Sequence, residues 1–205
     1  MLTKNQIKLA PLYDKPFFTT RDISNILGMG MKSSSVFCSR YPRKGVFIKL
    51  KNNYYSMAQK WEKNSHEDYY KISSILRVSS YISLLSALHY YYEITTQIPN
   101  SCFESVTTLA SKEYSVKGVI FRYHKINKDF FRSFVRKNEF FVAGKEKAFL
   151  DAVYLYSFGK YKIDLSAINL SKLDLKKLSV MLREYPEKTR KAIKKYAGYN
   201  KARTI

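Results

Sequence analysis

The chain has 205 residues, of which 37 are Lys or Arg and 16 are Asp or Glu, so its formal net charge is +21. Its 45% hydrophobic content, with 18 Tyr and 13 Phe, excludes a disordered chain and suffices for one or two domains. Two cysteines, Cys38 and Cys102, are too few for a disulfide framework, which favours a reducing cytosol, although one bonded pair remains open. No apolar run approaches the roughly 20 residues that span a bilayer, so we expect a soluble, cytoplasmic protein with no membrane partner.

The positive charge is concentrated at the two ends of the chain. Residues 1–60 carry a net charge of +9, residues 61–157 carry +3, and residues 158–205 carry +9. A basic field of this size attracts phosphate polyanions. A Lys-rich but merely solvated surface is the alternative, yet a general bias toward lysine would also load the middle of the chain.

The first 60 residues predict three helices. The first contains Gln6, Leu9, Ala10 and Tyr13 and ends before Pro16. The second is capped by Thr19 or Thr20, has Ile23, Ile26 and Leu27 on its apolar side, and ends at Gly28, the residue type expected just after a helix. The third spans residues 32–41, with Val36, Phe37 and Tyr41 facing inward, and Pro42 stops it.

A β-hairpin follows the third helix. Strands are predicted at residues 46–50 and 54–57, with a turn at 51–53 where Asn tolerates a positive φ. Two helices joined by a tight turn and followed by a hairpin are typical of a winged helix-turn-helix, which places its second helix in the major groove of DNA. A small three-helix domain that uses its third helix for protein contacts is the alternative.

The polar residues of this segment lie where a winged helix would contact double-stranded DNA. Short hydroxyls and cations suit phosphates and base edges. The predicted DNA-binding residues are Lys32, Ser33, Ser34, Ser35, Arg40, Arg43, Lys44, Lys49, Lys51, Asn52 and Asn53.

The remainder of the chain predicts a second domain. Residues 61–78 are expected to form a connecting helix, at 61–76, that separates a DNA-binding domain at 1–60 from a domain at 79–205. Within the latter, residues 79–157 are mixed α/β, with a helix from 82 to about 92, strands at 103–109, 118–125 and 139–143, and a helix at 145–156. Residues 158–205 form basic helices, one of them with Leu173, Leu175, Leu178 and Leu182 on one side. The fold class is therefore α+β.

The sequence carries no recognisable catalytic or cofactor motif. His66, His89 and His124 lie too far apart for a local metal motif, and no phosphate-binding glycine loop or nucleophile elbow occurs. Glu146 and Asp151 are five residues apart on the 145–156 helix, which is poor spacing for a shared acid–base site. We therefore expect a non-enzymatic protein without metal or cofactor.

Two further segments carry a resemblance to a known family. The segment 80–88, SYISLLSAL, and the segment 141–151, FVAGKEKAFLD, follow the winged-helix pattern in an order that resembles the AbiEi family of bacterial type IV antitoxins. The resemblance covers roughly residues 3–157. It departs from the family at Ser79 and Lys145, where proline is usual, and at Tyr92, where glycine is usual.

The resemblance implies a function for each part. The winged helix would bind inverted repeats in operator DNA, as a monomer or a DNA-induced dimer, and repress its own operon. The second domain would counter a nucleotidyltransferase-like toxin without a stable complex. The motif residues Ser80, Tyr81, Ser83, Glu146, Lys147 and Asp151 would serve this domain, either as a functional surface or by maintaining the fold through capping and a buried ion pair.

Two other functions remain open. The protein could neutralise a toxin by direct binding, with its basic ends matching an acidic partner. It could also be a nucleic-acid-binding regulator outside toxin–antitoxin systems, including an RNA-binding factor, since exposed tyrosines can stack on bases.

Overall fold

The computed structural model describes residues 7–98 and 101–203. The chain divides into two compact units, residues 1–76 (unit 1) and 77–205 (unit 2), and each is described by itself. Both units combine helices with a sheet, so the chain is α+β. Within the described ranges, no helix has the length and apolar character needed to cross a membrane.

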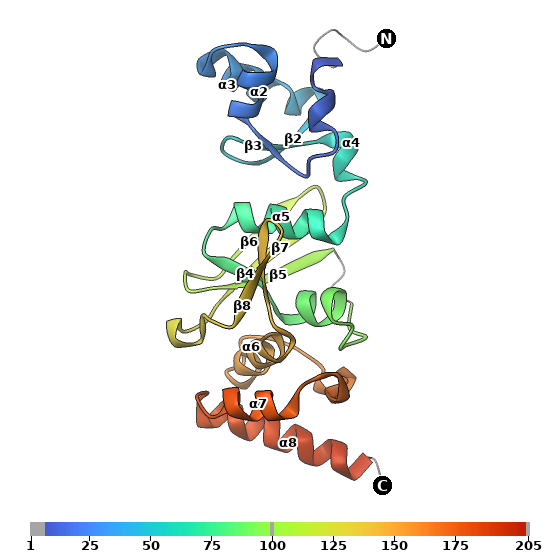
Figure 1. Cartoon of the computed structure of the whole chain (residues 1–205), viewed down its shortest axis with the longest axis vertical. Helices are drawn as coiled ribbons and strands as arrows, with labels where there is room; N and C mark the ends of the chain where they lie inside the picture. The colour runs from blue at the N-terminus through green and yellow to red at the C-terminus, as the bar shows by residue number, and fades with distance from the viewer. Residues whose placement is uncertain (1–6, 99–100, 204–205) are drawn as a thin grey trace. The chain divides into compact units, whose positions relative to one another are not determined.

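Unit 1 consists of short helices around a small antiparallel sheet with strand order β1-β3-β2 (Figure 1). Its elements, in chain order, are η1 (Ala10–Leu12), β1 (Phe18–Thr19), α2 (Thr20–Leu27), α3 (Met31–Arg40), η2 (Pro42–Lys44), β2 (Phe47–Lys51), β3 (Tyr54–Met57), α4 (Ala58–Trp61) and α5 (His66–Leu76). The β2–β3 hairpin is confirmed, and Asn53 takes a φ of 65° at its turn. Gln6, which the first predicted helix includes, lies outside the described residues.

The core of unit 1 is formed by apolar side chains from all of its early elements. Leu9, Leu12, Phe18, Ile23 and Phe47 are each at most 2% exposed. The Phe18 ring meets the Phe47 ring edge-on, with centroids 4.9 Å apart. Phe37 of α3 also contacts the Phe47 ring, with centroids 6.1 Å apart, so aromatic packing holds β1 and α3 against β2.

Several predictions for unit 1 are wrong. The first predicted helix does not continue to Tyr13, because a turn at Leu9 ends the helical residues 7–8 and the 3-10 helix η1 follows. Val36 was expected to face inward but is 46% exposed. The helix expected over residues 61–76 begins only at His66, because Ser65 and Asp68 cap a helix start there and Trp61 is the last residue of α4. The Ser65 hydroxyl accepts from the Asp68 N–H at 3.2 Å, and Asp68 accepts from the Ser65 N–H at 3.0 Å. This reciprocal pair stabilises a helix N-terminus and so interrupts the predicted helix.

Unit 2 is built on a six-stranded mixed sheet with strand order β6-β7-β5-β4-β9-β8. The pairs β5–β7 and β4–β9 are parallel and the others antiparallel. Its elements are β4 (Ser80–Ile82), η3 (Ser86–Tyr91), β5 (Cys102–Thr107), β6 (Lys112–Val116), β7 (Val119–Lys125), η4 (Lys128–Phe130), β8 (Phe134–Lys137), β9 (Phe140–Ala143), α6 (Lys145–Ser157), η5 (Leu165–Ala167), η6 (Leu170–Lys172), α7 (Leu175–Leu182) and α8 (Glu187–Arg203).

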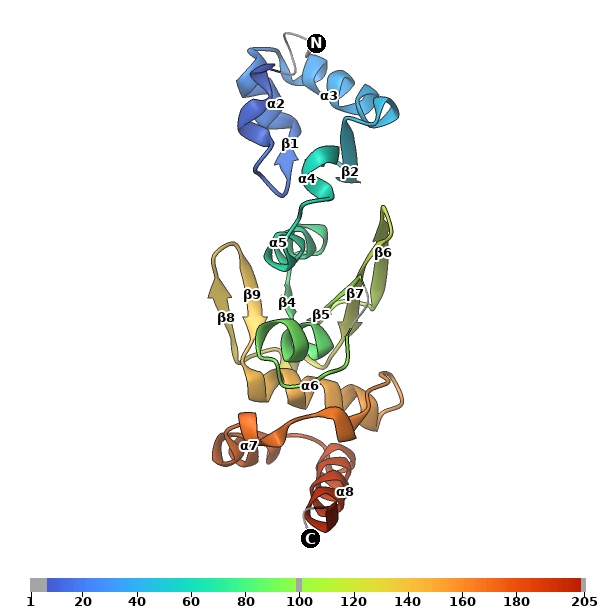
Figure 2. The same cartoon turned by 90° about the vertical axis from the view of Figure 1, so that its right-hand side faces the viewer.

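The helix α6 lies between the sheet of unit 2 and the two helices α7 and α8 (Figures 1 and 2). The i, i+3, i+4, i+7 spacing of Phe149, Ala152, Val153 and Tyr156 predicts one buried stripe along this helix. The first three are fully buried, but Tyr156 is 43% exposed, and the charged Lys147 is buried as well. Because α6 is covered on two sides, a single-stripe pattern did not describe it.

Other predictions for unit 2 need correction. Residues 80–82 form strand β4 instead of leading into a helix at 82, because they pair with β5 on one side and β9 on the other. The strands β6 and β8 were not predicted. Leu175 is 58% exposed, since Asp174 caps α7 and leaves Leu178 as the helix residue that is buried. The helix at 145–156 is confirmed by α6.

Candidate nucleic-acid interface

A tight turn sets α3 at a fixed angle to α2. Thr19 and Asp22 form a capping box at the start of α2, with N···O distances of 3.2 and 2.7 Å. Gly28 ends the helix with a φ of 65°, a left-handed conformation that glycine adopts at low cost. The Ser24 hydroxyl then donates to the Met29 carbonyl at 2.6 Å, which holds the turn. The structure thus confirms two predictions for this helix, a threonine cap at its start and Gly28 at its end.

The first turns of α3 expose most of the predicted DNA-binding side chains. Lys32, Ser33 and Ser35 are exposed, and so is Arg40 at the end of the helix. Ser34 is the exception and must be withdrawn from the contact list: it is fully buried and its hydroxyl donates to the Gly30 carbonyl at 3.1 Å. This bond to the carbonyl four residues earlier satisfies the buried hydroxyl, but it does not replace the side-chain cap that Gly30 lacks.

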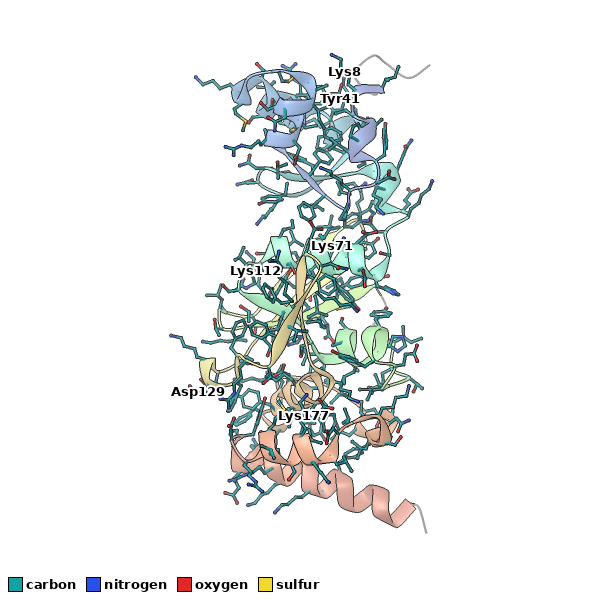
Figure 3. All side chains as sticks on the ribbon, in the orientation of Figure 1. Lys8, Tyr41, Lys71, Lys112, Asp129 and Lys177 are labelled. Atoms are coloured by element: carbon teal, nitrogen blue, oxygen red, sulfur yellow. The ribbon has the colours of Figure 1, made fainter. Side chains whose placement is uncertain are left out.

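A groove of about 510 Å³ runs along the exposed side of α3 and into η2. Three cations, Lys32, Arg40 and Lys44, contribute to its lining, and no acidic side chain does so among the described residues. Its aromatic part is Phe37 stacked on Tyr41 with centroids 3.9 Å apart; Tyr41 is labelled in Figure 3. The Lys44 ammonium lies 5.4 Å from the Tyr41 ring centroid. The groove therefore offers positive charge on a rigid aromatic support.

The hairpin residues divide into exposed and bound side chains. Lys49, Asn52 and the η2 residue Arg43 are exposed. Lys51 is only partly exposed, because its ammonium donates to the Ile75 carbonyl and lies 4.5 Å from the Tyr54 ring centroid. Asn53 is exposed but also accepts from the Thr20 N–H through its backbone carbonyl at 3.1 Å. Lys51 is therefore committed to its own unit, and Asn53 is needed for the turn.

The second set of predicted site residues forms a buried polar cluster in unit 2. Asp151 lies at its centre. The Tyr81 hydroxyl donates to Asp151 Oδ2 at 2.9 Å, and the Ser83 hydroxyl donates to the same oxygen at 2.8 Å. Lys147 pairs with Asp151 Oδ1, and its ammonium also donates to the Tyr185 hydroxyl at 3.1 Å. These five residues, Tyr81, Ser83, Lys147, Asp151 and Tyr185, are called the Asp151 cluster below.

Burial controls the protonation chemistry of this cluster. Asp151 is 0% exposed and Lys147 is 1% exposed. Burial raises the pKa of Asp151 and lowers the pKa of Lys147, while their mutual attraction opposes both shifts. Burial also raises the pKa of Tyr81, so its phenol stays protonated and donates to the carboxylate. Because these side chains are so deeply buried, they offer no surface to a partner. This agrees with the alternative in which the motif residues maintain the fold through a buried ion pair.

Glu146 and Ser80 lie outside the Asp151 cluster. Glu146 accepts from the Asp174 N–H at 3.0 Å and pairs with Lys177 at 3.0 Å; Lys177, labelled in Figure 3, belongs to α7. Burial by itself would raise the pKa of Glu146, but these two contacts lower it below the ordinary value overall. Glu146 therefore anchors the start of α7 to α6. Ser80 is buried and donates to the Arg77 carbonyl at 2.8 Å.

Sequence reasoning missed several residues of both sites. Met29, Phe37 and Tyr41 line the groove beside the predicted cations. Tyr185 completes the Asp151 cluster from a segment 38 residues after Lys147, and no local pattern marks it.

Cys38 and Cys102 are both free and buried. Nowhere in residues 7–98 and 101–203 do three or more His, Cys, Asp or Glu side chains gather as a metal site.

Comparisons with known proteins identify no relative. Neither a scan against protein-family models nor a search of curated proteins finds a match for this chain. The resemblance to the AbiEi antitoxins consequently remains a hypothesis based on the residues of the segments 80–88 and 141–151.

Proposed function

We propose that the protein is a DNA-binding antitoxin of the type IV kind that represses its own operon. The observation that carries this proposal is the groove along α3, which Lys32, Arg40 and Lys44 line and whose described lining residues include no carboxylate. A positively charged helix after a tight turn, followed by a hairpin, is the arrangement with which winged helices bind duplex DNA.

In this proposal the exposed polar residues of α3 and of the hairpin have distinct roles. The N-terminal turn of α3 enters the major groove, where Lys32 and Ser33 reach base edges or phosphates. Arg40 and Lys44 neutralise phosphates beside the groove. The exposed hairpin residues Lys49 and Asn52 serve as the wing. Ser34 and Lys51 take no part, because both are already bonded within the unit.

The second half of the proposal concerns unit 2 and the partner. Unit 2 would act against a nucleotidyltransferase-like toxin in the cytoplasm, with no enzymatic activity of its own. The support for this half is the resemblance at residues 80–88 and 141–151. The Asp151 cluster contains residues of both segments and joins them in one buried site. The Asp151 cluster would then maintain the fold of the antitoxin unit and leave toxin neutralisation to its surface.

The experiment measures binding of the full-length protein to the DNA upstream of its own gene at several salt concentrations. Each phosphate neutralised adds roughly 0.9 to the slope of log affinity against log salt. The double variant K32A/R40A should lower both the affinity and the slope. Its matched control, K15A/K63A, removes the same charge from exposed lysines elsewhere in unit 1 and should change little. Equal losses for both variants, or a flat salt response, would reject the proposed interface.

A second measurement separates the modes of antitoxin action. The protein is co-expressed with the toxin encoded beside it, and growth is recorded together with co-purification at high salt. Rescue of growth without co-purification supports the proposed mode. A complex that survives high salt supports neutralisation by direct binding, the alternative raised by the basic composition. Absence of rescue would remove the antitoxin function and leave a DNA-binding regulator.

A further inference from the structure

A pocket of about 580 Å³ lies in unit 2, apart from the Asp151 cluster. Its floor is formed by alternate residues of two parallel strands, β5 and β7, in which Glu104 is the register partner of Arg122. Its wall is the segment of residues 159–162 that follows α6. A cavity of this size falls within the range of small-molecule sites, roughly 300–1,000 Å³.

The bottom of the pocket holds a buried carboxylate between two aromatic side chains. Glu104 is 3% exposed. The Tyr161 hydroxyl donates to its Oε2 at 2.6 Å, and the His124 Nε2 lies 3.4 Å from its Oε1. The His124 and Tyr161 rings meet edge-on with centroids 5.2 Å apart. Burial, followed by the neighbouring Glu104, raises the pKa of Tyr161, so the phenol remains a donor to this carboxylate.

The His124 ring has one nitrogen that is shielded from solvent. This nitrogen, Nε2, makes no hydrogen bond within the described residues, and its neighbour is Glu104 Oε1 at 3.4 Å. Buried polar atoms in folded proteins nearly always have a partner. His124 therefore lies against Glu104 at the base of the pocket, and a molecule bound above it would change the surroundings of its ring.

The mouth of the pocket is cationic. Lys160 and Lys162 are exposed, and neither makes an ion pair or a side-chain hydrogen bond within the described residues. Arg122 is 41% exposed and uses its Nε–H to bind Glu113 at 2.8 Å. Two lysines without an ion pair and the Glu113-bound Arg122 therefore line one opening above the buried Glu104 carboxylate, and the excess positive charge favours an anionic ligand.

The remaining lining is apolar and aromatic. Leu85 and Ile120 contribute aliphatic surface beside the rings of Tyr161 and His124. A bare phosphate would leave most of the 580 Å³ unfilled. A nucleoside phosphate combines an anionic end, a polar sugar and a flat base, and so matches a cationic mouth and an aromatic wall. From this combination we propose that the pocket between β5, β7 and residues 159–162 binds a nucleoside phosphate, with its phosphate at Lys160, Lys162 and Arg122.

The proposal does not depend on DNA binding by unit 1. The same contacts admit a simpler role, in which Glu104 and Tyr161 only fasten residues 159–162 to the sheet. That role requires Glu104 and Tyr161 for stability but assigns nothing to Lys160 and Lys162. Removing these two exposed lysines therefore separates binding from folding.

The test is calorimetric titration of the full-length protein with AMP, ATP and inorganic phosphate. We expect both nucleotides to bind at one site per chain, and inorganic phosphate to bind at least ten-fold more weakly. The variant K160A/K162A should weaken nucleotide binding at least ten-fold with an unchanged thermal midpoint. Its control, K128A/K176A, removes the same charge from exposed lysines that do not line the pocket and should change the affinity less than two-fold. Absence of nucleotide binding would overturn the proposal, as would equal losses for both variants or equal affinity for phosphate alone.

Histidine NMR locates the ligand independently of charge. The chain has three histidines, His66, His89 and His124, and H124Q identifies the His124 imidazole signals by their loss. Addition of AMP should shift the His124 signals and leave those of His66 and His89 in place. Binding of AMP that moves His66 or His89 but leaves His124 unchanged would place the nucleotide elsewhere and overturn the assignment.

Discussion

Helix α3 in unit 1 and helix α6 in unit 2 both carry lysines that the sequence marks as functional, yet their surroundings are opposite. Lys32 on α3 is exposed at the edge of a groove, whereas Lys147 on α6 is 1% exposed. Helix α3 covers one side of a small core, while α6 is covered on both sides. The number of layers around a helix, and not its composition, decides whether its charges are available to a ligand.

The difference has an energetic consequence. An exposed cation is solvated, so its removal changes binding to a polyanion and leaves stability almost untouched. A buried cation depends on the groups that surround it, so its removal leaves a partner unpaired in an apolar interior. Substitution of an exposed cation on α3 should therefore change DNA binding, whereas substitution of a buried charge on α6 should change the free energy of unfolding.

The largest expected effect is on Asp151. The substitution Asp151→Asn leaves Lys147 buried without a counter-charge, and we expect a loss of about 3–5 kcal/mol in the free energy of unfolding. Urea denaturation of the full chain measures it.

A double variant tests whether the unpaired charge causes that loss. In K147M/D151N no buried charge remains, and the Asn amide oxygen still accepts from Tyr81 and Ser83. The double variant should be more stable than Asp151→Asn alone. If both lose the same stability, packing and not charge dominates the Asp151 cluster.

Glu146 should give the next largest effect, with a defined pH dependence. Glu146→Gln weakens the contacts to the Asp174 N–H and to Lys177, and we expect a loss of about 1.5–3 kcal/mol at pH 7. The pKa of Glu146 is lowered in the folded chain, so its stabilisation is complete above the ordinary value of 4.5 and declines as the pH falls below it. The stability difference between Glu146→Gln and the parent should therefore shrink below pH 4.5. Glu187→Gln, at a 69% exposed carboxylate, is the control and should cost little at either pH.

A smaller effect is expected at the start of α2. Thr19→Ala removes the hydroxyl that accepts from the Asp22 N–H, and loss of such a cap costs about 1 kcal/mol. Thr19→Ser keeps the hydroxyl and should retain most of the stability. Thermal or urea unfolding measures both variants, and equal losses would show that the Thr19 methyl group, instead of the cap, stabilises the helix.

Local signals explain which elements could be predicted. The Thr19 cap, the Gly28 stop and the turn before Tyr54 are short-range features of the chain, and the structure confirms each of them. The start of α6 at Lys145 was predicted for the same reason. Strand β4 failed because its identity depends on pairing with β5 and β9, which follow it at a distance in sequence.

The candidate sites show the same limit. The exposed cations of α3 were predictable because a short helix over one core has a single solvent face. The contacts of Tyr81 and Ser83 with Asp151 join residues 70 and 68 positions apart, and the sequence singled these residues out through resemblance and not through geometry. The Glu104, His124 and Tyr161 group was not predicted at all, since the parallel pairing of β5 with β7 brings Glu104 near His124, and the segment after α6 adds Tyr161.

The smallest effects should distinguish two lysines on one strand. Lys49 is exposed on β2, whereas the Lys51 ammonium is held by the Ile75 carbonyl and the Tyr54 ring. If Lys49 contacts one phosphate, Lys49→Ala should lower the salt slope of DNA binding by about 0.9 and leave stability unchanged. Lys51→Ala should leave the slope unchanged and lower the stability by about 0.5–1 kcal/mol, because the ring contact is lost. The reverse result would be a changed salt slope for Lys51→Ala alone. It would mean that the Lys51 ammonium leaves the Ile75 carbonyl to bind DNA. The distinction between exposed lysines and lysines bonded within the protein would then fail even within unit 1.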